Sequence, residues 1–429
     1  MIHVQQNPFM PSVAPAPLDF APLRVATPVM SGTRARSRGT HLRETAPRLR
    51  GAVRRYARGE RGNMDRKLLF FAALALAACT PDFDPASKVD RLRVLAIRAD
   101  PPEIEPPPAA GPAAAPDRAA LTSFVLRGDS TSDPGHRTTV LYLACTPAPG
   151  DPTSSPCAAY AGLRDPSALV AEAMRAGCGA SGGGSPAAIG FAGIEVCQAG
   201  ACGPATVSVG GAPVALPPPE LAIPPGYGFD GLPPGSPERI LGVQAQVVAF
   251  ALDATPEELA AGPGSGCPYA DIGERMAQLW PAREHVLATK TVRIRGPEAL
   301  DPPNRNPAVD GIAAGGTPLA SGSPVSSLSA GTWQLRPVLS PEAVALQETY
   351  TRLDAAGTPV ERAPEEWVYS WFATAGEIHD LHTREPKPDD WKVREGDAGA
   401  SGARALVAAV VRDLRGGTAW VLREVVVGP

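Results

Sequence analysis

Aromatic residues are scarce in this sequence, at 5% of 429 residues, and only five lysines stand against 35 arginines. No apolar run approaches the roughly 20 residues that a membrane-spanning helix needs, which argues against a polytopic membrane protein. Proline (50 residues) and glycine (44 residues) are abundant, together about 22% of the chain. This composition argues against helical bundles and coiled coils and predicts a mainly β protein with short strands and many turns.

The formal net charge of −4 averages two unlike regions. Residues 1–78 carry twelve arginines and Lys67 against four carboxylates, a net charge of +9, so the remainder of the chain carries −13. An acidic main body lacks the basic patch with which proteins bind a phosphate backbone. The sequence therefore predicts no nucleic-acid partner.

A short apolar segment follows two basic residues, Arg66 and Lys67. Its eleven residues, 68–78, are too few to cross a bilayer but are typical of the hydrophobic part of a secretory signal peptide. The segment ends in Leu76-Ala77-Ala78-Cys79. We therefore interpret residues 64–78 as a signal peptide. The alternative is a buried apolar helix that happens to end in cysteine, against which the polar, proline-bounded stretch 80–85 argues.

Residues 64–79 resemble the lipobox region of bacterial lipoproteins. The resemblance implies that the thiol of Cys79 receives a diacylglyceryl group, that a dedicated peptidase cuts before it, and that the new amino terminus is acylated. Two or three acyl chains, at about 0.8 kcal/mol per buried methylene, would make the membrane anchor effectively permanent. In some bacteria an acidic residue after the cysteine retains a lipoprotein in the inner membrane. Position 80 is threonine, so the outer membrane is favoured.

Residues 1–63 precede this signal and are rich in arginine and proline. We expect them to be disordered and to be an over-extended reading of the gene, with Met64 as the true initiator. An arginine-rich, acid-poor leader also resembles an organelle transit peptide, but a lipobox has no role behind one. Residues 79–90 are then the tether of the mature chain.

Six cysteines remain after Cys79, an even number that predicts disulfides formed outside the cytoplasm. Fifteen pairings are possible. Closeness in sequence favours disulfides between Cys145 and Cys157 and between Cys197 and Cys202. This leaves Cys178 to pair with Cys267. The sequence has no C-x-x-C motif and no histidine near these cysteines, so we expect neither a zinc site here nor any cofactor.

Strand and turn signals predict two β-sandwich domains of the immunoglobulin-like type, residues 91–300 and 308–429. The first carries a Cys-, Gly- and Pro-rich insertion, 146–235, and short helices, one of which begins with a capping box at Thr255 and Glu258. The proline-rich segment 301–307 is the predicted linker. In the second domain about seven short strands are expected, with a hairpin around 413–417.

These regions are similar to uncharacterised lipoproteins of high-GC Gram-negative bacteria that carry immunoglobulin-like β-sandwiches behind a lipobox. The similarity lies in residues 94–102, in Tyr369-Ser-Trp-Phe and in residues 411–420. The similarity implies a fold and a cellular location, but it does not indicate any activity.

Three groups of residues invite a chemical interpretation. Ser181 lies in Gly-Ala-Ser-Gly-Gly, which matches the G-x-S-x-G nucleophile pattern but lacks the strand before it and the helix after it. His379 and His382, near Glu377 and Asp380, form the one histidine cluster, which is expected to be a solvated loop or else a metal site. Side-chain oxygens in the predicted linker, 301–307, could bind a calcium ion, but Arg305 and three prolines in the same segment favour a stiff spacer.

Together these features predict a lipid-anchored cell-envelope protein, without enzymatic activity, that serves as a structural, adhesion or ligand-binding module. An envelope protein or a polysaccharide is the expected partner. The alternative is a secreted hydrolase or metal-binding protein that uses Ser181 or the pair of His379 and His382.

Overall fold

The structure is a computed structural model. It describes residues 86–105, 117–147, 157, 167, 170–171, 173–174, 189–209, 212–223, 229, 231–260, 268–354, 358–384, 387–397 and 402–428. The signal peptide, Cys79 and most of the tether lie outside these ranges. The described part is mainly β and contains several sheets, which confirms the predicted class. Within it, no helix is both long and apolar enough to cross a membrane.

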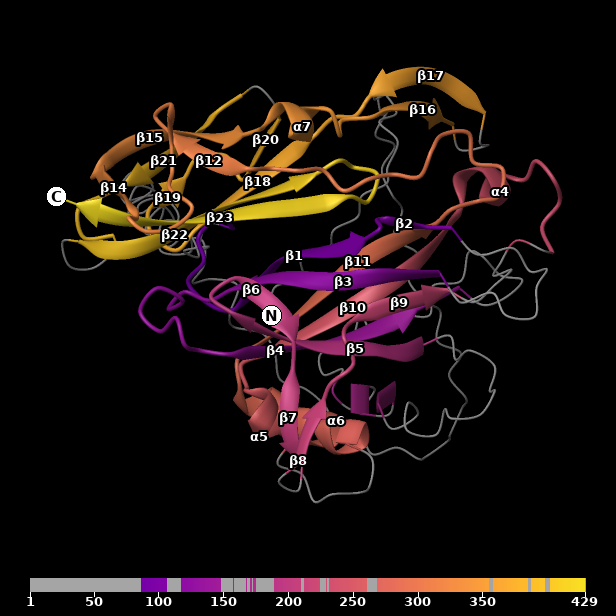
Figure 1. Ribbon diagram of the computed structural model, residues 1–429, viewed down its shortest axis with the longest axis horizontal. Helices are drawn as coiled ribbons and strands as arrows, with labels where there is room; N and C mark the ends of the chain where they lie inside the picture. Colours follow the sequence, from indigo (N-terminus) through magenta and orange to yellow (C-terminus); the bar gives the residue numbers. More distant parts are fainter. Residues whose placement is uncertain are drawn as a thin grey trace, which may run out of the picture. The chain divides into compact units, whose positions relative to one another are not determined.

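The first half of the described chain builds two sheets (Figure 1). The smaller sheet has the order β1-β3-β9, with strands β1 (Arg93–Asp100), β3 (Asp117–Leu126) and β9 (Glu220–Ile223). The larger sheet has the order β2-β11-β10-β4-β5-β6, with strands β2 (Glu103–Ile104), β11 (His285–Ile294), β10 (Val243–Leu252), β4 (Thr138–Cys145), β5 (Ile189–Gln198) and β6 (Ala201–Pro204).

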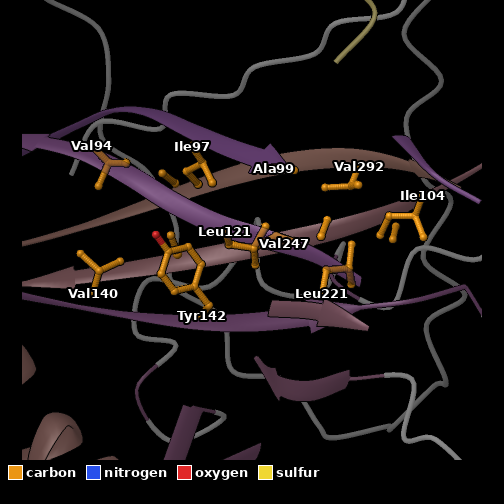
Figure 2. Packing of buried hydrophobic residues seen from close by; sticks show 14 of the residues in the cluster. Val94, Ile97, Ala99, Ile104, Leu121, Val140, Tyr142, Leu221, Val247 and Val292 are labelled. Carbon is orange, nitrogen blue, oxygen red and sulfur yellow. The ribbon is translucent and has the colours of Figure 1, made fainter. Parts of the chain in front are cut away.

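One hydrophobic core lies between these two sheets. Figure 2 shows its side chains approaching from both sides, with Leu121 of β3 near Val247 of β10 and Tyr142 of β4. Since successive side chains of a strand point to opposite faces, each sheet contributes every second residue to this core. The main apolar residues that the smaller and the larger sheet contribute to this core are Val94, Ile97, Leu121, Leu221, Val140, Val247 and Val292.

The larger sheet is covered on its other face as well. A second core packs strands β4, β10 and β5 against helical residues and a hairpin. The helical residues are Val170, Ala173 and Met174 and those of α5 (Pro256–Ala260) and α6 (Pro268–Leu279), and the hairpin consists of β7 (Thr206–Val209) and β8 (Ala212–Ala215). Because both faces are covered, β4 and β10 are almost entirely buried, which explains their continuous apolar runs. The expected insertion 146–235 is thus integral to the fold, since it supplies β5, β6 and β9.

The second half of the described chain builds two further sheets of five strands each. One has the order β13-β12-β15-β21-β19, with β13 (Thr317–Pro318), β12 (Gly311–Ala314), β15 (Gly331–Val338), β21 (Asp389–Val393) and β19 (Glu377–Ile378). The other has the order β14-β23-β22-β18-β20, with β14 (Ser326–Ser329), β23 (Thr418–Gly428), β22 (Ala403–Arg412), β18 (Val368–Ala373) and β20 (His382–Arg384).

These two sheets enclose a core of their own. Trp367, Tyr369 and Trp371 alternate along and just before β18 and are all buried in it, as their spacing predicts. Facing them, Trp391 of β21 is fully buried. The sequence predicts about seven short strands in this half but gives no signal for several elements of two to six residues, namely β13, β14, β17 (Pro359–Pro364), β19, β20 and β21.

A further cluster of buried residues joins the two halves, so that the described residues belong to one compact unit. The rings of Phe124 from β3 and Trp420 from β23 stack with centroids 5.5 Å apart. The end of the expected tether takes part, because Val89 is fully buried and its amide donates to the carbonyl of Ala373. The other main members are Leu95, Ala96, Leu126, Phe372, Leu406, Ala408 and Val410.

Local signals set the remaining short elements, which are α4 (Pro237–Leu241), η1 (Trp280–Ala282), α7 (Pro341–Val344) and the hairpin of β16 (Thr349–Leu353) with β17. The predicted capping box is confirmed: Thr255 Oγ1 accepts from the amide of Glu258, whose carboxylate accepts from the amide of Thr255. The 413–417 hairpin is also confirmed, with Gly416 at φ +117° and Leu414 at φ +63°.

Candidate functional site

Two cysteine pairs lie at disulfide distance. The Cα atoms of Cys145 and Cys157 are 5.6 Å apart, and those of Cys197 and Cys202 are 4.0 Å apart. The second pair joins facing residues of the β5–β6 hairpin. These are the two pairs that local closure favours. Cys178 and Cys267 lie outside the described residues.

Ser181, the sequence candidate for a nucleophile, also lies outside the described residues. His136 is the histidine with the closest carboxylate contact, because its Nε2 lies 2.5 Å from Asp253 Oδ1. Its other neighbours are Arg127 and Asp133. Arg127 also pairs with Asp129 and Asp253, and these contacts hold the loop before β4 against the end of β10 without presenting a hydroxyl or thiol to the imidazole.

The two histidines of the H-x-x-H pair have separate surroundings. His379 follows β19 with a side chain that is 79% exposed, and its Nδ1 lies 3.4 Å from Asp380 Oδ1. His382 begins β20, and its Nδ1 lies 2.9 Å from the hydroxyl of Ser370, which also accepts from Arg412. Partial burial, together with the charge of Arg412, lowers the pKa of His382. Among the described residues, no group of three potential metal ligands contains both histidines.

The structure instead brings His379 together with two carboxylates. A ring nitrogen of His379 and one oxygen each from Asp380 and Asp389 all lie within 4.8 Å of one another. Asp389 begins β21 and is only 2% exposed. Burial raises the pKa of its carboxyl group. Asp389 gives no signal in the sequence, because the proline-rich stretch 385–390 is typical of an ordinary loop.

One other group of three possible metal ligands occurs among the described residues, namely Glu195, Cys197 and Cys202. The two sulfur atoms are bonded to each other, so neither is available as a thiolate.

A polar group missed by sequence analysis lies inside the first core. Ser123, Tyr142 and Glu195 are all buried, and the amide of Ser123 donates to Glu195 Oε1 at 2.7 Å. The phenol of Tyr142 donates to the same oxygen and also contacts the hydroxyl of Ser123. Burial raises the pKa of Glu195 to about 7, against the opposing effect of these hydrogen bonds. A single glutamate inside the apolar run of β5 was the only signal in the sequence.

The linker residues whose oxygens suggested calcium have different hydrogen-bond partners. Asp301 accepts from the amide and the hydroxyl of Thr351, Asn304 donates to Asp413 at 2.8 Å, and Asn306 donates to the carbonyl of Ala99. Asn304 is only 2% exposed. These side chains do not converge on one point, and the linker is tied to both halves of the fold.

A cavity of about 310 Å³ lies beside the β16–β17 hairpin. Its lining consists of Gln347, Arg352, Ala363, Pro364, Glu365, Glu366 and Trp367. This volume is at the lower end of the range for small-ligand sites, and the side chains offer both donors and acceptors.

A comparison of the chain with protein-family models and with curated proteins finds no match in either.

Proposed function

We propose that this chain is a lipid-anchored protein of the bacterial cell envelope, with Cys79 as its lipidated first residue and the outer membrane as its location. The observation that carries the proposal is the order of basic residues, eleven apolar residues and Leu76-Ala77-Ala78-Cys79. Two cysteine pairs at disulfide distance support it, because disulfides persist in the oxidising compartments that such a signal leads to.

The folded part would comprise two immunoglobulin-like β-sandwich domains, residues 91–300 and 308–429. Two hydrophobic cores, each enclosed by a pair of sheets, support this division. The joint at 301–307 and the cluster around Phe124 and Trp420 would hold the domains in one orientation. A rigid pair of sandwiches on a lipid tether suits a structural, adhesion or ligand-binding role.

The lipid anchor is tested by labelling cells with an alkyne analogue of palmitate and isolating the protein. The wild-type chain should carry the label, and Cys79→Ser should lose both the label and its membrane association. Cys202→Ser is the matched control, because it removes a cysteine that is expected to form a disulfide and should keep the label. A wild-type chain without label would contradict the anchor.

A polysaccharide is the partner that we propose, with the cavity beside the β16–β17 hairpin as its candidate site, since sugar hydroxyls need both donors and acceptors and Arg352 and Glu365 in the cavity wall supply them. Cosedimentation of the full chain with purified envelope polysaccharide tests this role. Arg352→Ala, in the cavity wall, should reduce the bound fraction, whereas Arg394→Ala, an exposed arginine outside the cavity lining, should not. Equal binding by both variants would remove the cavity from the proposal.

A further inference from the structure

The paired ends of β19 and β21 bring three potential metal ligands close together. His379 and Asp380 directly follow β19, and Asp389 is the first residue of β21. Their ligand atoms lie within 4.8 Å of one another. Nitrogen and oxygen ligands at about 2.0–2.2 Å from one ion are about 3–4 Å apart, so small rotations of the two outer side chains, His379 and Asp380, would close the site.

The two oxygens of Asp389 differ in a way that points to a missing partner. Oδ1 accepts hydrogen bonds from the amides of Asp380 at 2.9 Å and Asp390 at 2.8 Å. Oδ2 is buried and has no hydrogen-bond partner. A buried carboxylate oxygen without a partner is unfavourable, and a cation beside it would remove that cost. The two amides meanwhile hold the carboxylate in a fixed position.

Lys387 is a competing cation, with its Nζ 2.7 Å from Asp380 Oδ2. Its side chain is 67% exposed, and such surface ion pairs contribute at most about 1 kcal/mol. The lysine occupies one oxygen of Asp380, and the other oxygen faces His379. An ion could therefore bind Asp380 through Oδ1 while Lys387 keeps its contact.

We propose that His379, Asp380 and Asp389 form a binding site for a divalent first-row transition-metal ion, with Zn²⁺ as its representative. Imidazole as a ligand favours such ions over Ca²⁺ and Mg²⁺, which prefer oxygen alone. Three protein ligands leave a coordination position for water or for an external ligand. The site differs from the H-x-x-H pair, because Asp389 takes the place of His382.

Binding of a metal ion would also stabilise one edge of a sheet. β19 is the edge strand of the order β13-β12-β15-β21-β19, and its pairing with β21 is limited to two residue pairs. An ion held by residues that follow β19 and begin β21 would link these two short strands. Metal binding should therefore raise the stability of the folded protein.

The test uses the full chain, purified in detergent without a polyhistidine tag and treated with a chelator. Zn²⁺ is titrated against a chromophoric competitor, and bound zinc is counted after dialysis. Three variants are compared with the wild type: His379→Ala, Asp389→Asn and His382→Gln. Asp389→Asn keeps an acceptor for the two amides and removes the charge, while His382→Gln is the matched control.

The wild type and His382→Gln should bind one equivalent of Zn²⁺ and melt at a higher temperature when it is present. His379→Ala and Asp389→Asn should bind at least about tenfold more weakly and lose the thermal shift. His379 is exposed, so its variant should fold normally in the absence of metal. Binding that survives in His379→Ala, or that is lost only in His382→Gln, would overturn the proposal. Failure here leaves the lipid anchor untouched.

Discussion

Tyr142 donates a hydrogen bond from its phenol to Oε1 of Glu195 in the core between the first two sheets. Both side chains are almost completely buried, and the amide of Ser123 is the second donor to the same oxygen. Such a carboxyl group is held by hydrogen bonds but has lost its hydration. The loss of hydration dominates, because the pKa of Glu195 is raised to about 7.

This raised pKa predicts a pH-dependent stability. The native state binds the proton of Glu195 more tightly than the unfolded state, whose pKa is the ordinary 4.5, so stability falls as the pH rises from about 4.5 through about 7. The loss amounts to about 3 kcal/mol at 1.4 kcal/mol per pH unit. Urea unfolding at pH 5 and pH 8 measures it. Glu195→Gln should lose this component of the pH dependence, and an unchanged difference between the two pH values would contradict the assignment.

Asp413 at the β22–β23 hairpin predicts a large loss of stability on substitution. Its Oδ1 accepts from the amides of Arg415 and Gly417, and its Oδ2 accepts from the side chain of Asn304. Because Asp413 is 1% exposed, Asp413→Ala would leave these donors buried and unpaired, at a cost of about 3 kcal/mol or more. Chemical denaturation provides the measurement.

Asp397→Ala is the matched control for that substitution. Asp397 also accepts from a nearby amide, that of Arg394, but it is exposed, so water replaces the lost acceptor. The free energy of unfolding of the Asp397→Ala variant should differ from that of the wild type by less than about 1 kcal/mol. Similar losses of stability for Asp413→Ala and Asp397→Ala would show that the burial of Asp413 does not determine the loss.

Two glycines of β5 provide another matched comparison. Gly193 has φ +133°, and a Cβ there would lie 2.5 Å from the Cα of Pro219 and 2.6 Å from the carbonyl oxygen of Pro218. Gly190 has open space around its Cβ position. Gly193→Ala should lower the free energy of unfolding by at least about 2 kcal/mol, and Gly190→Ala should leave it within about 1 kcal/mol of the wild type. Equal effects would contradict the close packing of β5 against the 218–219 segment.

The two disulfides should contribute stabilities that rise with the logarithm of the length of the loop that each closes. The sequence separations are 12 for Cys145 with Cys157 and 5 for Cys197 with Cys202. Loop-closure entropy then predicts losses of about 3 kcal/mol for Cys157→Ser and about 2 kcal/mol for Cys202→Ser. Thermal unfolding of the oxidised variants measures both losses. A variant that unfolds like the wild type would show that its bond is not formed in the isolated protein.

Much of the fold could be predicted from local patterns in the sequence. The alternation of Trp367, Tyr369 and Trp371, the capping box at Thr255 and the hairpin after Arg412 are all decided within a few residues. Segments of two to five residues, such as β19 and β21, give no comparable pattern. They become strands because long-range pairing with neighbours, here between Ile378 and Trp391, fixes their backbone.

The candidate site depended even more on long-range structure. The spacing of His379 and His382 suggested a pair, but the backbone directs His382 to Ser370 and leaves His379 beside Asp389. The partners of Glu195 lie 53 and 72 residues away in sequence. No local pattern could identify these contacts, because they depend on which strands are neighbours and on the face to which each side chain points.

The proposed lipid-anchored location is tested most directly by mass spectrometry of the amino-terminal peptide of the protein purified from its native membrane. The account predicts a peptide that begins at Cys79 and carries a diacylglyceryl group on its sulfur and an acyl group on its nitrogen. A peptide that begins upstream of Cys79, or one that begins there without lipid, would contradict it.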